Sequence, residues 1–397
     1  MHAVKLLHKW MADALPEMHR SRLNAVCIGV ESVLRGQRLW LTALGRHVPG
    51  KALEKHKIKR IDRLLGNHRL GHERAAIYRW LSSLLIGSCR HPCVIVDYSD
   101  IDPAKKLYLL RAAVSVGGRA LVLYEEVHTR YNHRSDTQGF LKQLVTILPD
   151  GCQPIIVTDA GFKSPWFRAV DALGWYYLGR VRSRDYVRFP DTTSWIPAKS
   201  LYERANSRPK ALGPLWIPRS SPLYTRAYVY RKHPKGRHRL TARGQRRRNG
   251  PSLKHARREC EPWLLISNLP PRRHIAKRII AIYRDRMTIE ESFRDLKAHR
   301  HGFAFRQNLG RQPDRIANLL LIAALATLCA WLTGLVGIAR GFARTLQANT
   351  ERRRRVLSTF FIGNRLIYQR FTMTKLDIRA ALDHLQRVIQ SPAGELL

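Results

Sequence analysis

The order of strand-like and helix-like segments between residues 91 and 182 limits the fold of this chain more than any other feature. A short run rich in β-branched residues, His91–Asp97, predicts a buried strand. Two further apolar runs, Tyr108–Val116 and Arg119–Val127, flank the pair Gly117 and Gly118. Because glycines adopt positive φ at no steric cost, these runs predict a hairpin that follows the first strand.

Helix-like and strand-like segments then alternate along the chain. Thr137–Leu148 has apolar residues at helical spacing, and Pro154–Asp159 predicts another buried strand. Ser164–Gly174 opens with Ser and Pro and closes with Gly, which predicts a helix with Ser164 as its N-cap. Trp175–Arg182 predicts a fifth strand. The order βββαβαβ indicates a mixed α/β core whose first three strands form a meander, which matches the ribonuclease-H-like layout.

The charge of the chain indicates what it binds. Lys and Arg number 71 against 29 Asp and Glu, a formal net charge of +42. Such an excess indicates a polyanionic partner, because Lys and Arg side chains that neutralise phosphates release counterions. The excess runs along the whole chain, which favours nucleic acid. A solvated basic surface and a ribosomal protein of an organelle are the alternatives.

Differences in hydrophobic periodicity and composition along the chain predict five regions. Residues 1–85 have helical periodicity, and residues 183–270 contain short aromatic-rich strands. Within the latter, Arg231–Glu259 holds twelve Lys or Arg and one acid, which predicts a basic loop. We expect a helical DNA-binding domain in 1–85, the first part of the core in 86–182, a β-rich insertion in 183–270, the second part of the core in 271–310, and a helical region for dimer contacts in 311–397.

One amphipathic segment of the N-terminal region, between residues 51 and 70, is strongly basic and predicts contacts with DNA. A solvated charged face is the alternative for this segment. The residues that we expect to bind DNA here are Lys55, Lys57, Lys59, Arg60 and Arg63.

Cysteine usage and apolar runs indicate the compartment. The six cysteines include no CxxC pair, which predicts reduced thiols in a reducing compartment. The first 20 residues contain no apolar run typical of a signal peptide. Leu319–Ala339 is 21 residues long without a formal charge, enough to span a bilayer, but it is alone and interrupted by Thr and Gly. We therefore expect a buried core helix, a protein of the cytoplasm or nucleoid, and no membrane association.

Two acids stand at the ends of predicted strands, and acids are scarce in this chain. Asp97 closes the first strand and Asp159 the fourth. Groups at the carboxyl ends of strands in an open α/β sheet gather at one edge, where ligands bind. Two carboxylates held together repel each other unless a divalent cation lies between them, and carboxylate oxygens suit Mg²⁺. Helix caps or salt bridges are the alternative roles.

A third acid lies in a striped segment, AIYRDRMTIEESFRDLK. Tyr283, Arg286, Glu290 and Lys297 stand at i, i+3, i+7 and i+14. On a single helix these positions fall within about 60° of one another. The mixture of an acid, two bases and a tyrosine predicts that Glu290 joins the two aspartates as a metal ligand, while Arg286, Lys297 and Tyr283 contact phosphate or sugar. A solvated face with an ordinary Arg286–Glu290 ion pair is the alternative.

The pattern Y-x2-R-x3-E-x6-K, placed after a β insertion and two strand-end aspartates, resembles the DDE transposases of bacterial insertion sequences. It is most similar to the YREK-signature, hairpin-forming, cut-and-paste group that includes the composite-transposon enzymes for tetracycline and kanamycin resistance. The phrases VDYSDI, VTDAGF, IKRIDRLLGN and EPWLLISNLP agree with this resemblance, which covers nearly the whole chain. Tyr98 departs from it, since tetracycline-type enzymes are expected to have Trp there.

The resemblance implies a reaction and a set of partners. Asp97, Asp159 and Glu290 would bind two Mg²⁺ ions, with Mn²⁺ able to substitute, for phosphoryl transfer without a covalent protein intermediate. One site would nick the transposon end, form a hairpin, reopen it and join the 3′-hydroxyl to target DNA. A homodimer would hold two inverted-repeat ends in a synaptic complex. Trp263 matches the residue that stacks on an unstacked base, with an ordinary buried strand aromatic as the alternative.

Other assignments stay open at this point. The rival carboxylates are Asp100, Glu125, Glu126, Asp285 and Glu291. We prefer Asp97 because Asp100 lies three residues past the predicted strand end, and Glu290 because Glu291 is about 100° away from the stripe on the helix. The rival functions are a catalytically silent, domesticated DNA-binding relative and another ribonuclease-H-like nuclease such as a junction resolvase.

Overall fold

The structure is a computed structural model of the whole chain. It describes residues 2–102, 106–182, 185–233, 241, 244–250, 252–253, 260–300, 302–351 and 353–390. Most of the predicted basic loop, Arg231–Glu259, lies outside the described residues.

The chain folds into two compact units, and these cut across the five predicted regions. The first unit comprises Met1–Cys152 and Met287–Ser391, and the second comprises Gln153–Arg286 and Pro392–Leu397. The predicted N-terminal and C-terminal helical regions thus belong to one unit, together with the first three strands of the core.

The first unit is largely helical, as expected for residues 1–85 and 311–397. Its helices surround a three-stranded sheet, and η3, a short 3₁₀ helix, follows α10. Their bounds are α1 (His2–Ala14), α2 (Arg20–Gly36), α3 (Leu41–Arg46), α4 (Glu54–Leu65), α5 (His68–Ile86), α6 (Arg134–Ile147), α10 (Met287–Lys297), η3 (Phe305–Gln307), α11 (Pro313–Ala339), α12 (Phe342–Leu346), α13 (Thr359–Tyr368) and α14 (Lys375–Gln390).

The sheet of the first unit confirms the predicted meander. Strands β1 (Cys93–Asp102), β2 (Leu107–Ser115) and β3 (Ala120–His128) pair antiparallel in the order β3-β2-β1. Gly117 and Gly118 form the hairpin turn with φ of 80° and 86°, which side chains other than glycine rarely adopt. The prediction that Asp97 ends the first strand is wrong. Strand β1 continues for five residues, because β2 offers pairing partners as far as Asp102↔Leu107.

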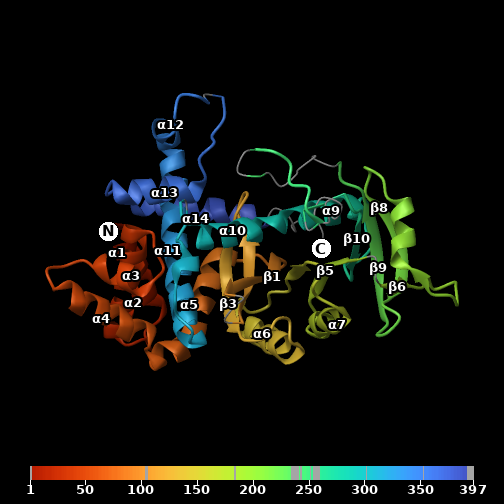
Figure 1. Cartoon of the computed structure of the whole chain (residues 1–397), viewed down its shortest axis with the longest axis horizontal. Coiled ribbons are helices and arrows are strands. Elements are labelled where there is room, and N and C mark those ends of the chain that lie inside the picture. The colour runs from red at the N-terminus through yellow and green to blue at the C-terminus, as the bar shows by residue number, and fades with distance from the viewer. Residues whose placement is uncertain are drawn as a thin grey trace. The chain divides into compact units, whose positions relative to one another are not determined.

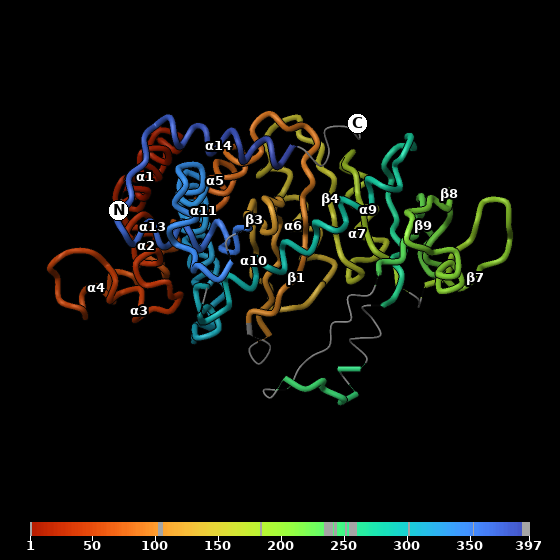
Figure 2. Tube along the Cα trace, turned by 90° about the horizontal axis from the view of Figure 1, so that it is seen from above, coloured from red at the N-terminus to blue at the C-terminus, as the bar shows by residue number. Residues whose placement is uncertain are grey.

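Helix α11 forms the centre of the first unit. It lies between α2 and β3 in Figure 1 and Figure 2, and it contacts both of these elements as well as α13. Among the described residues it is the one helix long and apolar enough to span a membrane, and 89% of its most apolar window is buried inside the protein. The expectation of a buried core helix is confirmed.

Two glycines allow α11 and α13 to touch backbone to backbone. A Cβ atom at Gly363 would lie 1.7 Å from the carbonyl oxygen of Ala330, and one at Gly334 would lie 2.1 Å from that of Thr359. Both distances are far shorter than any real carbon–oxygen contact. A side chain at either position must therefore push the two helices apart.

We expect Gly363→Ala to lower the free energy of unfolding by about 1–3 kcal/mol, because the added methyl overpacks a backbone contact. Urea unfolding followed by circular dichroism would measure the change. Gly139→Ala in α6 is the matched control, since a Cβ atom there meets nothing within 4 Å. This control should gain up to about 1 kcal/mol from helix propensity. Equal effects of the two substitutions would contradict the close approach.

The second unit is built on a mixed sheet in the order β4-β5-β10-β9-β8. Strand β4 pairs parallel with β5, and the remaining pairs are antiparallel. The strands expected as a separate insertion are present, but β8, β9 and β10 extend the same sheet from β5. The bounds are β4 (Ile155–Thr158), α7 (Ser164–Ala172), β5 (Tyr176–Val181), β6 (Tyr186–Val187), β7 (Ile196–Pro197), η2 (Ala198–Arg204), β8 (Lys210–Ile217), β9 (Leu223–Tyr230), β10 (Trp263–Ser267) and α9 (Ile275–Asp285).

Two local predictions in this part of the chain need correction. Ser164 is the first residue of α7, and Lys163 occupies the N-cap position. The segment expected as one striped helix consists of α9 and α10, with Arg286 as a turn residue between them. The Arg286 amide bonds to the Tyr283 carbonyl, three residues back, instead of four.

Candidate active site

Asp97 lies in the middle of β1, where its side chain is half-buried. Its Oδ1 accepts a hydrogen bond of 2.9 Å from the Tyr98 amide. In the sheet register Asp97 stands opposite Arg111 of β2, which stands opposite Glu125 of β3. Residues directly opposite in a sheet project from the same face, so all three side chains belong to one face of the meander.

A buried ion pair organises this face. The Arg111 guanidinium donates to Glu125 Oε1 over 2.6 Å, and the side chains are 4% and 2% exposed. Burial raises the pKa of Glu125, and the charge of Arg111 opposes that shift. Arg111 also donates to Ser292 Oγ over 3.0 Å and lies 4.6 Å above the ring of Phe293. Because Ser292 and Phe293 belong to α10, the pair fixes α10 onto the face that carries Asp97.

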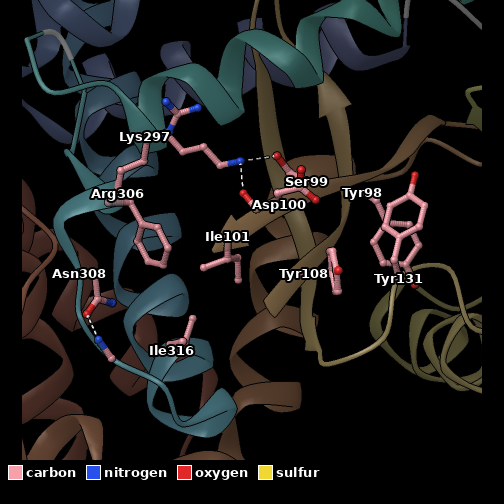
Figure 3. A pocket seen from close by; sticks show the side chains of 12 residues that line it. Tyr98, Ser99, Asp100, Ile101, Tyr108, Tyr131, Lys297, Arg306, Asn308 and Ile316 are labelled. Carbon is pink, nitrogen blue, oxygen red and sulfur yellow. Dashed lines mark hydrogen bonds between the residues drawn. The ribbon is translucent and has the colours of Figure 1, made fainter. Parts of the chain in front are cut away.

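Glu290 and Lys297 lie on α10, at opposite ends of the helix. Glu290 is exposed in its first turn. The Lys297 ammonium donates to Ser99 Oγ over 2.6 Å and to the Asp100 carbonyl, both in β1 (Figure 3). Burial and the nearby Arg306 guanidinium lower the pKa of Lys297 to about 8. Lys297 therefore holds α10 against the strand that carries Asp97, a role that spacing on the helix did not reveal.

An open pocket of about 800 Å³ adjoins this part of the first unit (Figure 3). Three tyrosines form one wall, with the Tyr98 and Tyr131 rings 5.1 Å apart and the Tyr108 and Tyr131 rings 5.5 Å apart. Tyr98 donates to or accepts from His128 Nδ1 over 3.0 Å. The Tyr98 ring is thus fixed, and an aromatic side chain is kept where Trp was expected.

Asp159 belongs to the second unit. It follows β4 directly, as predicted, and is half-buried. Its Oδ1 accepts a hydrogen bond of 2.8 Å from the Gly161 amide, so the carboxylate closes the turn after the strand.

Three further predicted site residues lie together in the second unit. The Tyr283 ring is 3% exposed and meets Trp263 edge to face, with centroids 5.0 Å apart. The Arg286 guanidinium lies 5.7 Å from the Tyr283 centroid and is also buried. Burial raises the pKa of Tyr283, Arg286 and Arg180 oppose the shift, and the Asp159 carboxylate adds to it. Asp159, Tyr283, Arg286 and Trp263 therefore interact, but Tyr283 and Arg286 are not on a solvated stripe.

Trp263 begins β10 and is half-buried. It packs between two tyrosines, at 5.8 Å from Tyr230 and 5.0 Å from Tyr283. Aromatic neighbours of this kind fit both a buried strand residue and a ring that stacks on a DNA base. The base-stacking role of Trp263 therefore stays a prediction.

The predicted basic residues of the N-terminal region lie on one helix, α4. Its apolar face is buried through Ile61, Leu64 and Leu65. Lys59 pairs with Asp62 over 3.4 Å, and Lys57 is half-buried. Lys55, Arg60 and Arg63 are exposed, so this face is accessible to a polyanion.

Three of the rival acids, Glu125, Glu126 and Glu291, form hydrogen bonds or ion pairs with neighbouring side chains. Glu125 is held by Arg111, and Glu126 accepts from Tyr124 and interacts with His128 Nε2 over 2.8 Å. Glu291 pairs with Arg294 over 2.6 Å and with Arg119 over 3.7 Å. Burial raises the pKa of Asp285, and Asp100 is exposed beyond the Ser99 anchor of Lys297.

The donor chemistry of the predicted triad fits a hard divalent cation, because all three groups are carboxylates that are exposed or half-buried. Asp97 and Glu290 belong to the first unit and Asp159 to the second. Within the part of the chain that the structure describes, no three or more His, Cys, Asp or Glu side chains are gathered as a metal site.

Comparison with known proteins decides the family. The transposase DDE domain matches residues 90–329, more than half of the chain. This chain belongs to the DDE transposases. The matched residues include Asp97, Asp159 and Glu290, and they run through both compact units. No curated protein matches the chain. Membership makes it a transposase-type nuclease whose partner is DNA, from a family that generally uses divalent metal ions.

Proposed function

We propose that this DDE transposase moves an insertion sequence by metal-dependent cut-and-paste transposition through a DNA hairpin. The observation that carries the proposal is the family match over residues 90–329, which contains the three acids chosen from strand and helix positions. Mg²⁺ is the expected cofactor, as two ions, with Mn²⁺ able to substitute. When bound, the ions would activate water or a 3′-hydroxyl and stabilise the leaving oxygen.

The protein side chains then have distinct tasks in the proposed reaction. Asp97, Asp159 and Glu290 hold the cations. Arg286 contacts a backbone phosphate, and Tyr283 packs beside it through the ring contact that the two residues share. Lys297 positions β1 through Ser99 and reaches phosphate from there. Arg286 and Tyr283 are buried here, so their contact with phosphate requires this part of the second unit to open when DNA binds. Because none of these groups recognises a particular base, one site can serve nicking, hairpin closure, hairpin opening and strand transfer.

The finer assignment within the family rests on residue spacing. Tyr283, Arg286, Glu290 and Lys297 fit the YREK signature, and the mixed α/β architecture is compatible with a ribonuclease-H-like core. We further propose a homodimer that pairs two inverted-repeat ends, with contacts from residues 311–397, end binding by α4, and action at the bacterial nucleoid.

A plasmid assay tests the proposal. The purified protein should nick supercoiled DNA that carries the element's inverted repeats when Mg²⁺ is added, and it should release ends closed as hairpins. A protein that binds these ends but never nicks them would be a silent DNA-binding relative. Cleavage that is indifferent to the inverted repeats would indicate another nuclease of this fold.

Trp263→Ala should nick transposon ends at a near-normal rate and accumulate the nicked intermediate at the expense of hairpin. Nicking needs no sharp bend, whereas hairpin closure needs a base to be unstacked and sheltered. Stacking on an aromatic ring is worth about 1–3 kcal/mol, or roughly 5- to 150-fold in the closure rate. Denaturing gels of end-labelled DNA separate the two products.

Two controls make the Trp263 result readable. Trp263→Phe keeps an aromatic ring at the start of β10 and should retain most of the hairpin yield. An abasic site near the transposon end should partly rescue Trp263→Ala, because less stacking is then lost. Equal loss of nicking and hairpin formation would show that Trp263 is a core residue of the second unit.

A further inference from the structure

A second pocket in the first unit lies away from Asp97, Glu290 and Lys297. It has a volume of about 1050 Å³ and is lined by the start of α1, the loop after α3, and the loop between α13 and α14. The first and last of these segments, far apart in the sequence, are joined by a hydrogen bond of 2.8 Å between His2 Nε2 and the Met373 carbonyl.

Every charged side chain that lines this pocket is basic. Lys5, Arg35, Arg46 and Arg370 contribute four cations, with His2 and His47 beside them. Arg35 pairs with Glu31 over 2.6 Å, and Arg46 pairs with Glu54 over 3.4 Å. Among the described residues, the Lys5 ammonium and the Arg370 guanidinium form no hydrogen bond or ion pair. The pocket therefore concentrates positive charge that the protein does not neutralise.

Arg370 occupies a backbone conformation that favours glycine over arginine. Arg370 has φ of 59°, in the left-handed region. It follows the end of α13, with its own amide bonded to Ile367 and the next amide bonded to Leu366. This is the position after a helix where glycine is strongly favoured, and other side chains are strained. A costly residue at an exposed turn points to a role for its side chain.

We propose that this pocket binds the phosphodiester backbone of duplex DNA. A second copy of this chain is a poorer match for these cations than DNA, because it offers only 29 Asp and Glu against 71 Lys and Arg. Single-stranded DNA is disfavoured, since such sites use several stacked aromatic rings, and the one strongly exposed ring here is Tyr368, 69% exposed. Phosphates of a duplex need only converging cations, which Lys5 and Arg370 supply.

This pocket, which is lined by residues from near both ends of the chain, would contact DNA in addition to α4 and the candidate active site. The proposal rests on the proposed function only for the nature of the ligand. Its test is equilibrium binding of the full-length protein to a duplex in EDTA, so that loss of cleavage cannot affect the result. Lys5→Gln with Arg370→Gln should flatten the plot of log affinity against log salt by about 0.9 per lost contact, and so by nearly 2.

Matched controls separate this pocket from the general basic surface. Arg379→Gln with Lys142→Gln removes the same charge from exposed sites on α14 and α6, and it should leave the slope unchanged. Arg370→Gly should keep or raise the thermal midpoint, because glycine tolerates the left-handed turn, while it still flattens the slope by about 0.9. Equal slopes for pocket and control variants, or an effect on single-stranded DNA alone, would overturn the proposal.

Discussion

Glu290→Gln should bind transposon-end DNA as tightly as the unchanged protein and lose Mg²⁺-dependent nicking by about 10²–10³-fold. The substitution preserves size and removes one negative charge from an exposed position in the first turn of α10. A cation that loses a charged ligand stabilises the leaving oxygen less well, and several kcal/mol of barrier correspond to this loss of rate. Asp97→Asn and Asp159→Asn should behave in the same way.

Glu291→Gln is the matched control, because it makes the same change one residue further along the same helix. Glu291 pairs with Arg294 and Arg119 outside the proposed metal site, so its loss should change the nicking rate by less than about fivefold, which corresponds to about 1 kcal/mol. Initial rates on supercoiled plasmid would compare all four variants. If Glu291→Gln abolishes nicking and Glu290→Gln does not, the third acid is misassigned.

Local sequence was enough to predict the framework of the first unit's sheet. The hairpin followed from Gly117 and Gly118, whose positive φ few other residues tolerate. The end of the first strand did not follow, because three of the five residues after Asp97 are Ser or Asp and are held in β1 by pairing with β2. Strand pairing over this distance is a tertiary effect, which periodicity along the chain does not encode.

In the candidate site, too, spacing along the chain did not predict contacts between distant segments. Spacing placed Tyr283, Arg286, Glu290 and Lys297 on one stripe, yet neither Gly nor Pro marks the interruption at Arg286. Nor could spacing show that Lys297 donates to Ser99, 198 residues away in the chain. The acids and bases were chosen from the sequence by their chemical type, whereas their contacts depend on how distant segments fold together.

The largest effect on stability should come from the buried ion pair behind Asp97. Arg111→Met should lower the free energy of unfolding by about 3–5 kcal/mol at neutral pH, because Glu125 stays buried without its cation. The Tyr78 hydroxyl, 3.5 Å from Glu125 Oε2, is too distant to replace a guanidinium. Arg130→Met is the control, since its pair with Asp136 is exposed on the arginine side and should cost at most about 1 kcal/mol.

The pH dependence of the stability of Arg111→Met would show whether the buried Glu125 charge causes the destabilisation. Burial already raises the pKa of Glu125 in the folded protein, and removing Arg111 should raise it further. The folded state then holds a proton that the unfolded state releases, so stability falls as pH rises through the range between the two pKa values. Below the unfolded value, near 4.3, both states are protonated and this loss disappears. Urea unfolding of Arg111→Met across pH should therefore show its smallest destabilisation in acid.

Arg111→Met with Glu125→Leu, which leaves no buried charge, should recover much of the stability and lose this pH dependence. A destabilisation that is the same at every pH, and undiminished in the double variant, would mean that Arg111 acts through its packing on Phe293 and its bond to Ser292 instead of its charge.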